Sequence, residues 1–150
     1  RRGERIAILI DQNVLPGDGG VFLEFFGRPV PVSPVVDPIA RRTGALVLPV
    51  FCTIRPDGRY LAYAGAPIVP QLEPDANGVT RQCLEALEGE ILKAPGQWNW
   101  MYKRWKFIPS GEERQGYPYY ARYEMSREQG RKTVVATPED SCTAAGTGLD

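Results

Sequence analysis

The stretch RIAILIDQ, residues 5–12, indicates the fold class of this chain. An unbroken apolar run follows Arg5 and ends at Asp11, as in a strand that is buried on both faces. Strands of this kind belong to parallel sheets that are covered by helices. The stretch ALVLPVF, residues 45–51, predicts a second buried strand. Together these two stretches favour an α/β fold.

A helix and a hairpin are predicted around the second strand. Ser33 and Pro34 are typical of a helix start, and Gly44 is typical of a helix end. The residues PDG at 56–58 form a typical turn. They predict a hairpin whose second strand spans residues 59–65.

A second helix is predicted over residues 75–93, with Asp75 as its cap. Its apolar residues recur on one helical face. They are Val79, Cys83, Leu87 and Ile91. The stretch VFLEFFG, residues 21–27, fits either a short strand or a packed apolar loop, and bulky residues at helical spacing predict a short helix within residues 98–105. The order of elements predicts a layered α/β/α sheet.

The composition is that of one modest domain with a hydrophobic core. The 150 residues are 43% hydrophobic, and 18 basic residues balance 18 acidic ones. This balance argues against a general attraction to nucleic acid. No apolar run has the length of a membrane span. The three cysteines are widely spaced and predict no metal site.

We expect the domain to be incomplete at its N-terminus. The chain starts with Arg1 rather than methionine, and little sequence precedes residues 5–10 that would supply neighbouring strands. After residue 111 the sequence becomes small, polar and aperiodic. Residues 1–111 are therefore predicted to form the domain, and residues 112–150 a polar extension that is disordered from about residue 127.

Several residues are candidates for chemistry. Asp11 follows a predicted buried strand at the end where α/β sheets place ligands, although capping of the next loop is an equal alternative. Arg55 suits an anionic group such as a phosphate, but a solvated hairpin arginine is the simpler interpretation. Cys52 fits a small buried hydrophobe better than a nucleophile. Histidine is absent, so the commonest general base near neutral pH is not among these residues.

The segment PGQWNWMYKRWKFIPSG, residues 95–111, combines three tryptophans with three cations and no acid. Aromatic and basic residues of this kind bind single-stranded nucleic acid, although no known binding module is present. They also suit a membrane, where Lys103, Arg104 and Lys106 would meet anionic lipid. The third alternative is structural, with Trp98, Met101 and Trp105 anchoring the last helix to the sheet.

The chain resembles the bacterial lipid A biosynthesis acyltransferases over about residues 3–111. The resemblance rests on motifs that occur in the family's order. They are Asp11-Gln12 after a strand, Phe25-Phe26-Gly27, the helix IARRTGAL at residues 39–46, and the closing segment from Pro95 to Lys106. The family's closing His-Arg-Arg is Tyr102-Lys103-Arg104 here. The family's catalytic His-x4-Asp/Glu motif has no counterpart in this chain.

The resemblance implies transfer of a fatty acyl group from acyl-ACP or acyl-CoA to a hydroxyl of a lipid A precursor or related lipid. In this mechanism a histidine deprotonates the hydroxyl, which attacks the thioester. These 150 residues are therefore expected to be inactive alone and to form part of a longer enzyme, with no bound cofactor. The expected partners are acyl carrier protein or acyl-CoA, the lipid acceptor and the membrane surface, at the cytoplasmic face of the inner membrane.

The resemblance also implies supporting roles for particular residues. Asp11 and Gln12 would lie near the site, Phe25 and Phe26 would line an acyl slot, and the basic residues would meet phosphorylated lipid or acyl carrier protein. These basic residues are Arg55, Lys103 and Arg104. A non-catalytic module that binds lipid or acyl carrier is the main alternative. An RNA-binding module is a third hypothesis, and we expect no nucleic acid partner.

Overall fold

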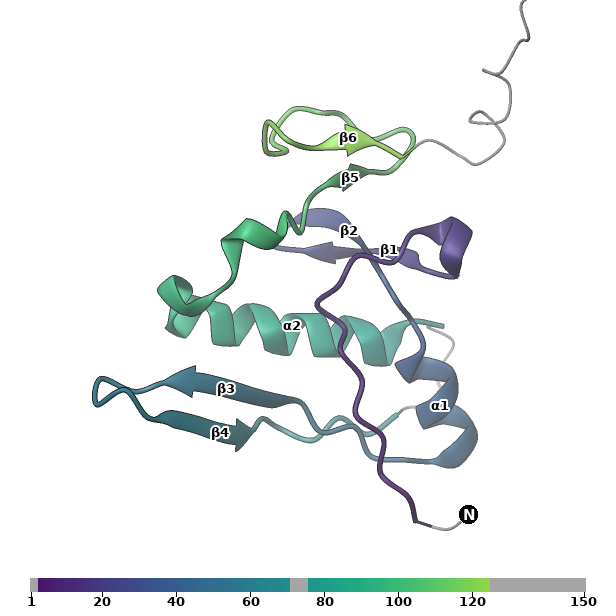
Figure 1. Cartoon of the computed structure of the whole chain (residues 1–150). Helices are drawn as coiled ribbons and strands as arrows, with labels where there is room; N and C mark the ends of the chain where they lie inside the picture. The colour runs from purple at the N-terminus through teal and green to yellow at the C-terminus, as the bar shows by residue number, and fades with distance from the viewer. Residues whose placement is uncertain (1–2, 71–75, 125–150) are drawn as a thin grey trace, which may run out of the picture.

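A long helix, α2, separates two β-hairpins in the computed structural model, which describes residues 3–70 and 76–124 (Figure 1). The helices are α1 (Val36–Thr43) and α2 (Gly78–Lys93). The strands are β1 (Val21–Phe25), β2 (Arg28–Val32), β3 (Val50–Ile54), β4 (Tyr60–Ala64), β5 (Phe107–Ile108) and β6 (Arg122–Tyr123). Three single turns of 3-10 helix span Pro16–Asp18, Pro95–Gln97 and Trp100–Tyr102. The predicted mixed α/β class is confirmed.

The β1–β2 hairpin forms the main core with α2. Its strands are antiparallel, with Phe25 opposite Arg28, and a two-residue turn joins them at Phe26 and Gly27. Both turn residues have positive φ, 50° and 69°, as the twist of a tight hairpin requires. The buried residues of this core come from both strands and from α2. They are Leu23, Phe25, Val30, Val32, Leu84 and Ile91.

The two helices are joined by a buried carboxylate. Asp37, in the first turn of α1, is 1% exposed. Its oxygens accept hydrogen bonds from the backbone N–H groups of Val79 and Thr80, at 2.9 and 3.0 Å, and from the Thr80 hydroxyl. Asp37 thus satisfies backbone donors at the start of α2 that have no partner within the helix.

Both predicted helices are present, but α1 begins later than predicted, at Val36, with Val35 rather than Ser33 at the cap position and no side-chain cap. Gly44 ends α1 in the left-handed conformation, with φ 67°, as predicted. The predicted apolar face of α2 is largely confirmed, since Val79, Cys83 and Ile91 are buried and Leu87 packs beside them. The predicted cap Asp75 lies outside the described residues.

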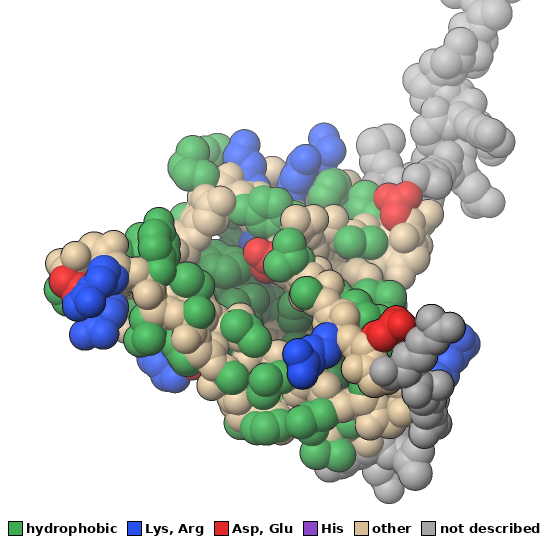
Figure 2. Space-filling model, turned by 60° about the horizontal axis from the view of Figure 1, so that its bottom comes forward, with side chains coloured by type: hydrophobic (Ala, Val, Ile, Leu, Met, Phe, Trp, Pro, Cys, Tyr) green, Lys and Arg blue, Asp and Glu red, His purple; other side chains and the backbone are tan. Residues whose placement is uncertain are grey.

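The β3–β4 hairpin is confirmed, but the prediction of a buried strand at residues 45–51 was wrong in its bounds and in its burial. Strand β3 begins at Val50, and its residues are alternately exposed and half-buried because the hairpin has only one partner face. One face of this hairpin packs toward α2, where the Tyr63 hydroxyl donates to Glu90 Oε2 at 2.6 Å. The other face is uncharged and exposed (Figure 2). Its residues are Val50, Cys52, Ile54, Tyr60, Ala62 and Ala64.

The prediction of a buried strand at residues 5–10 was wrong for the described structure. These residues cross the molecule without a strand assignment (Figure 1). Ile8 and Ile10 contact the core, whereas Ile6 and Leu9 are 69% and 75% exposed. A strand requires a partner for its backbone groups. The described strands pair instead in three separate two-stranded sheets, which replace the single layered sheet that we expected.

The closing segment, from Pro95 to Lys106, also differs from the prediction. The predicted helix within residues 98–105 is replaced by the 3-10 turns and a reversal at Lys103, where φ is 58°. Residues 112–124 then return to the domain, because Tyr117 is buried and β6 pairs with β5 in parallel. The predicted disorder from residue 127 lies outside the described residues. Within the described ranges, neither helix is long and apolar enough to span a bilayer.

Candidate functional site

Arg104 is the centre of a buried polar cluster. Its side chain is 2% exposed and reaches two segments that are distant in sequence. Nη1 donates to Asn13 Oδ1 at 2.8 Å and to the Pro31 carbonyl at 2.9 Å, and Nη2 donates to the Ile10 carbonyl at 3.5 Å. The guanidinium carbon also lies 5.6 Å from the centre of the Phe25 ring. Arg104 therefore joins the closing segment to the loop around Asp11 and to β2.

Burial lowers the pKa of Arg104 to about 10, because the charged guanidinium loses its hydration. The charges of Tyr102 and Asp11 act in the opposite direction and raise this pKa. Arg104 therefore stays cationic at neutral pH. The burial also corrects one expected role, since Arg104 does not face a surface where it would meet lipid phosphates.

Asp11 and Asn13 lie beside this guanidinium. Asp11 is partly exposed, and within the described part of the chain its buried Oδ1 has no hydrogen-bond partner. Asn13 is held from the other side, because its backbone N–H donates to the Tyr102 hydroxyl at 2.6 Å and its Nδ2 donates to the Lys103 carbonyl at 3.4 Å. Gln12 is exposed between them. The structure thus brings Asp11, Gln12, Lys103 and Arg104 together.

The predicted pair of phenylalanines divides between core and surface. Phe25 is 0% exposed. Its ring centre lies 4.9 Å from that of Phe26, 5.7 Å from that of Trp105 and 6.3 Å from that of Trp98. Phe26 is half-buried in the hairpin turn, where its N–H donates to Glu88 Oε1 at 2.8 Å. Phe26 therefore remains the member of the pair that a ligand can reach.

Arg55 is not part of this cluster. It follows β3 at the tip of the β3–β4 hairpin, on the other side of α2 from β1–β2 (Figure 1). The Arg55 side chain is exposed, with Nε 3.9 Å from Asp57 Oδ2.

The alternative in which aromatic residues anchor the closing segment fits Trp98 and Trp105, which pack against the main core. It does not fit Met101, which is 86% exposed.

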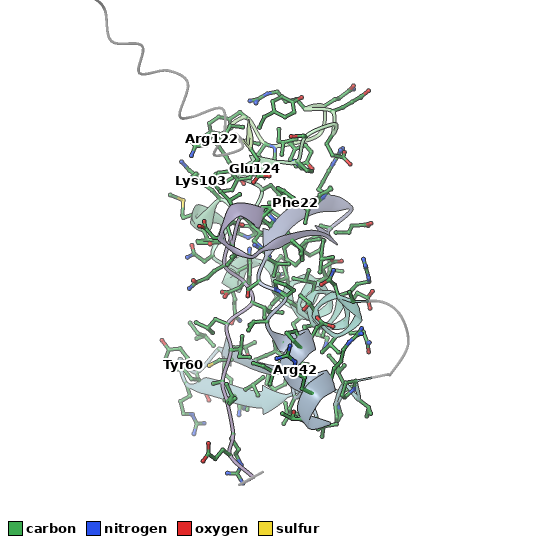
Figure 3. All side chains as sticks on the ribbon, turned by 90° about the vertical axis from the view of Figure 1, so that its right-hand side faces the viewer. Phe22, Arg42, Tyr60, Lys103, Arg122 and Glu124 are labelled. Carbon is green, nitrogen blue, oxygen red and sulfur yellow. The ribbon has the colours of Figure 1, made fainter. Side chains whose placement is uncertain are left out.

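A basic and aromatic patch lies at the β5–β6 end of the molecule. Lys103 and Arg122 lie at this end, far from Arg42 and Tyr60 (Figure 3). Lys106 and Arg122 approach the Phe107 ring, with charge-to-ring-centre distances of 5.2 and 5.4 Å. We define the basic patch as Lys103, Lys106 and Arg122.

Sequence reasoning missed Asn13, Tyr102 and Asp37. Asn13 directly follows the Asp11-Gln12 motif, and Tyr102 stands where the resembling family has histidine, so their positions offered a signal for both. No local sequence signal pointed to Asp37, because its partner Thr80 lies 43 residues further along the chain. No group of three or more metal-ligating side chains occurs within the described ranges.

The two described cysteines should differ in reactivity. Burial raises the pKa of the Cys83 thiol to about 11, and the nearby charge of Asp37 adds to this. At pH 8 only about one in a thousand of these thiols is ionised, and the thiolate is the nucleophile. Cys52 is exposed on the outer face of β3, so the interpretation of Cys52 as a buried hydrophobe was wrong. We expect iodoacetamide to modify Cys52 and to leave Cys83 intact, as read by mass spectrometry of tryptic peptides. Modification of Cys83 should rise with pH, and in urea both should react. Equal labelling of the native protein would contradict this result.

Comparison with known proteins agrees with the motifs. The family model for bacterial lipid A biosynthesis acyltransferases matches residues 1–107, which include the Asp11 loop, β1–β2 and the closing segment. Neither the curated proteins nor the solved structures gave a match. Since the family model covers more than half of the 150 residues, the chain belongs to the bacterial lipid A biosynthesis acyltransferase family.

Proposed function

We propose that this chain forms part of a longer enzyme that transfers a fatty acyl group from a carrier thioester to a hydroxyl of a lipid A precursor or related lipid. The observation that carries the proposal is the Arg104–Asn13 hydrogen bond, which spans 91 residues. It joins the Asp11-Gln12 motif to the closing segment. Two motifs of the family thus meet in one cluster.

The reaction requires a base that these residues do not provide. The acceptor hydroxyl oxygen attacks the thioester carbonyl carbon, the new C–O bond forms and the C–S bond breaks. The hydroxyl proton passes to a base and then to the departing thiolate. The chain has no histidine, so we assign the base to a His-x4-Asp/Glu motif outside these 150 residues. The cluster around Asp11 then serves to bind and orient the acceptor.

The basic patch suits an acidic partner. Lys103 and Arg122 are exposed, and Trp100 and Met101, which precede Lys103 in the chain, are 52% and 86% exposed. Such a surface fits acyl carrier protein, or the anionic headgroups at the cytoplasmic face of the inner membrane. Arg55, at the hairpin tip, is a second candidate contact for a lipid phosphate.

A direct assay tests the catalytic proposal. A radiolabelled acyl-ACP and a hydroxyl-bearing lipid A precursor are incubated with the complete encoded protein and, separately, with residues 1–150. We expect labelled ester only from the complete protein. Ester formation by residues 1–150 alone would place the base within this chain and contradict the proposal.

A non-catalytic module that binds lipid or acyl carrier is the second candidate, favoured by the absence of histidine from the sequence. It would give no ester with any form of the protein. It would still bind acyl carrier protein or anionic vesicles at low salt, and Lys103→Glu with Arg122→Glu would weaken that binding. Arg42→Glu, at the other end of the molecule (Figure 3), is the matched control.

A further inference from the structure

We infer that Arg104 is a positioning residue that fixes the loop on both sides of Asp11 and so presents the Asp11 carboxylate to a neutral hydroxyl group of a ligand. The inference rests on the proposed function, in which that hydroxyl belongs to the acyl acceptor. The inference assigns a role to the buried Arg104, and it names the chemical class of the ligand group that donates a hydrogen bond to Asp11.

The loop is held at its two ends by one guanidinium. Arg104 donates to Ile10, which precedes Asp11, and to Asn13, which follows Gln12. The same Nη1 also donates to the Pro31 carbonyl in β2. A planar guanidinium spreads its donors over acceptors in several directions, whereas the compact ammonium of lysine does not. The position of the loop therefore depends on the shape of Arg104 as well as on its charge.

The hydrogen bonds around Asp11 leave one oxygen of its carboxylate, Oδ1, without a partner in the described part of the chain. Asn13 is bonded on three sides, by Arg104, Tyr102 and the Lys103 carbonyl. Asp11, in the same loop, makes no ion pair or hydrogen bond through Oδ1 in the part of the chain that the structure describes. A buried acceptor without a partner is unfavourable, and a carboxylate accepts several hydrogen bonds. A ligand that donates a hydrogen bond to Asp11 therefore gains more binding free energy than it would at a carboxylate whose oxygens already have partners.

The charge of Arg104 selects the kind of donor. Arg104 is close enough to Asp11 for their charges to interact. A cationic ligand would be attracted by Asp11 and repelled by Arg104, so its gain is small. A neutral O–H donates to the carboxylate without this repulsion. Asp11 is partly exposed although its Oδ1 is buried, so a small polar group approaches the side chain from the surface and donates to Oδ1 after a rotation of the carboxylate.

The first experiment needs no catalysis. Residues 1–150, labelled with 15N, are titrated separately with octyl glucoside and with octylammonium. Octyl glucoside is a neutral hydroxyl probe and octylammonium is a cationic probe, and both are used below their critical micelle concentrations. We expect octyl glucoside to shift the amide resonances of Gln12 and Asn13, and octylammonium not to do so. Arg104→Lys and Asp11→Asn should each abolish the shift, and Arg42→Lys, the same change at an exposed site, should keep it. Shifts by octylammonium alone, or a full shift in Arg104→Lys, would overturn the inference.

The second experiment uses acyl transfer by the complete protein. Loss of one hydrogen bond to a charged group corresponds to about a 10- to 100-fold loss in kcat/KM. We expect this loss in Asp11→Asn and in Arg104→Lys, and no greater loss in the double variant, because both act through one carboxylate. Multiplied losses would show that Arg104 acts independently and would overturn the inference. Where Arg104→Lys fails to fold, as read by circular dichroism, Asn13→Ala replaces it with the same expectations.

The two experiments separate this inference from the proposed function. Ester from no form of the protein, with the octyl glucoside shift present and dependent on Arg104, would end the catalytic proposal and support the positioning role. Ester from the complete protein, with multiplied losses in the double variant, would support the function and end the positioning role.

Discussion

Replacing Asp37 with alanine should lower the free energy of unfolding by about 2–4 kcal/mol. Asp37 is 1% exposed and accepts hydrogen bonds from the N–H groups of Val79 and Thr80 and from the Thr80 hydroxyl. Its loss removes the cap of α2 and leaves a buried hydroxyl and two backbone donors without their acceptor. Urea unfolding followed by circular dichroism measures the change.

Two variants control this result. Asp57→Ala removes an exposed carboxylate that pairs with Arg59 in the β3–β4 turn, and it should change stability little. Thr80→Val keeps the carboxylate and removes only the hydroxyl, so its effect should lie between the other two. A loss in Asp37→Ala no larger than that in Asp57→Ala would show that α2 does not depend on this contact.

Replacing Phe25 with alanine should cost about 3–5 kcal/mol of unfolding free energy. The Phe25 ring is fully buried, and it packs against Phe26, Trp98 and Trp105. Its backbone carbonyl also accepts a hydrogen bond from Trp105 Nε1 at 3.2 Å. Removing the ring opens a cavity between β1, α2 and the closing segment. Urea unfolding followed by tryptophan fluorescence measures the loss.

The control for this prediction is Phe22→Ala. Phe22 lies in the same strand but is only half-buried, so the same change in size removes less buried surface and should cost less. The comparison also tests the expectation that Phe25 lines an acyl slot. Retained stability with a loss of acyl transfer in Phe25→Ala would place Phe25 in a ligand site and contradict its role in the core.

Local sequence signals predicted the elements whose causes are local. Gly44 ends α1 because a left-handed residue is needed there. Residues 56–58 turn the β3–β4 hairpin because proline, aspartate and a glycine at φ 79° all favour a turn. The β1–β2 hairpin was harder to predict. Its turn places Phe26 at φ 50°, a conformation that its residue type does not favour. The surrounding packing imposes that turn.

The failed prediction at residues 5–10 has a non-local cause. The apolar pattern was identified correctly, since Ile8 and Ile10 do contact the core. A strand also needs a neighbour for its N–H and C=O groups, and an apolar pattern does not specify one. The contact of these apolar residues with the core was therefore predictable from the sequence, but the absence of a partner strand for them among the described residues was not.

The candidate site shows the same limit. Lys103 and Arg104 are adjacent cations, and the sequence treats them alike. The reversal at Lys103, with φ 58°, leaves the Lys103 side chain exposed and the next one buried. The partners of Arg104 lie more than 70 residues away, at Pro31 and Asn13. Membership in the cluster follows from tertiary packing, which no local pattern contains.

The outer face of β3–β4 has a practical consequence for anyone who purifies this chain. Its six side chains carry no charge and are mostly apolar, so removing them from water against a second copy of the face is favourable. Contacts between copies of the chain through this hairpin, well away from Arg104, should therefore limit the solubility of concentrated samples. Detergent or a few added acidic residues on that face would improve handling without altering the chemistry at the other end.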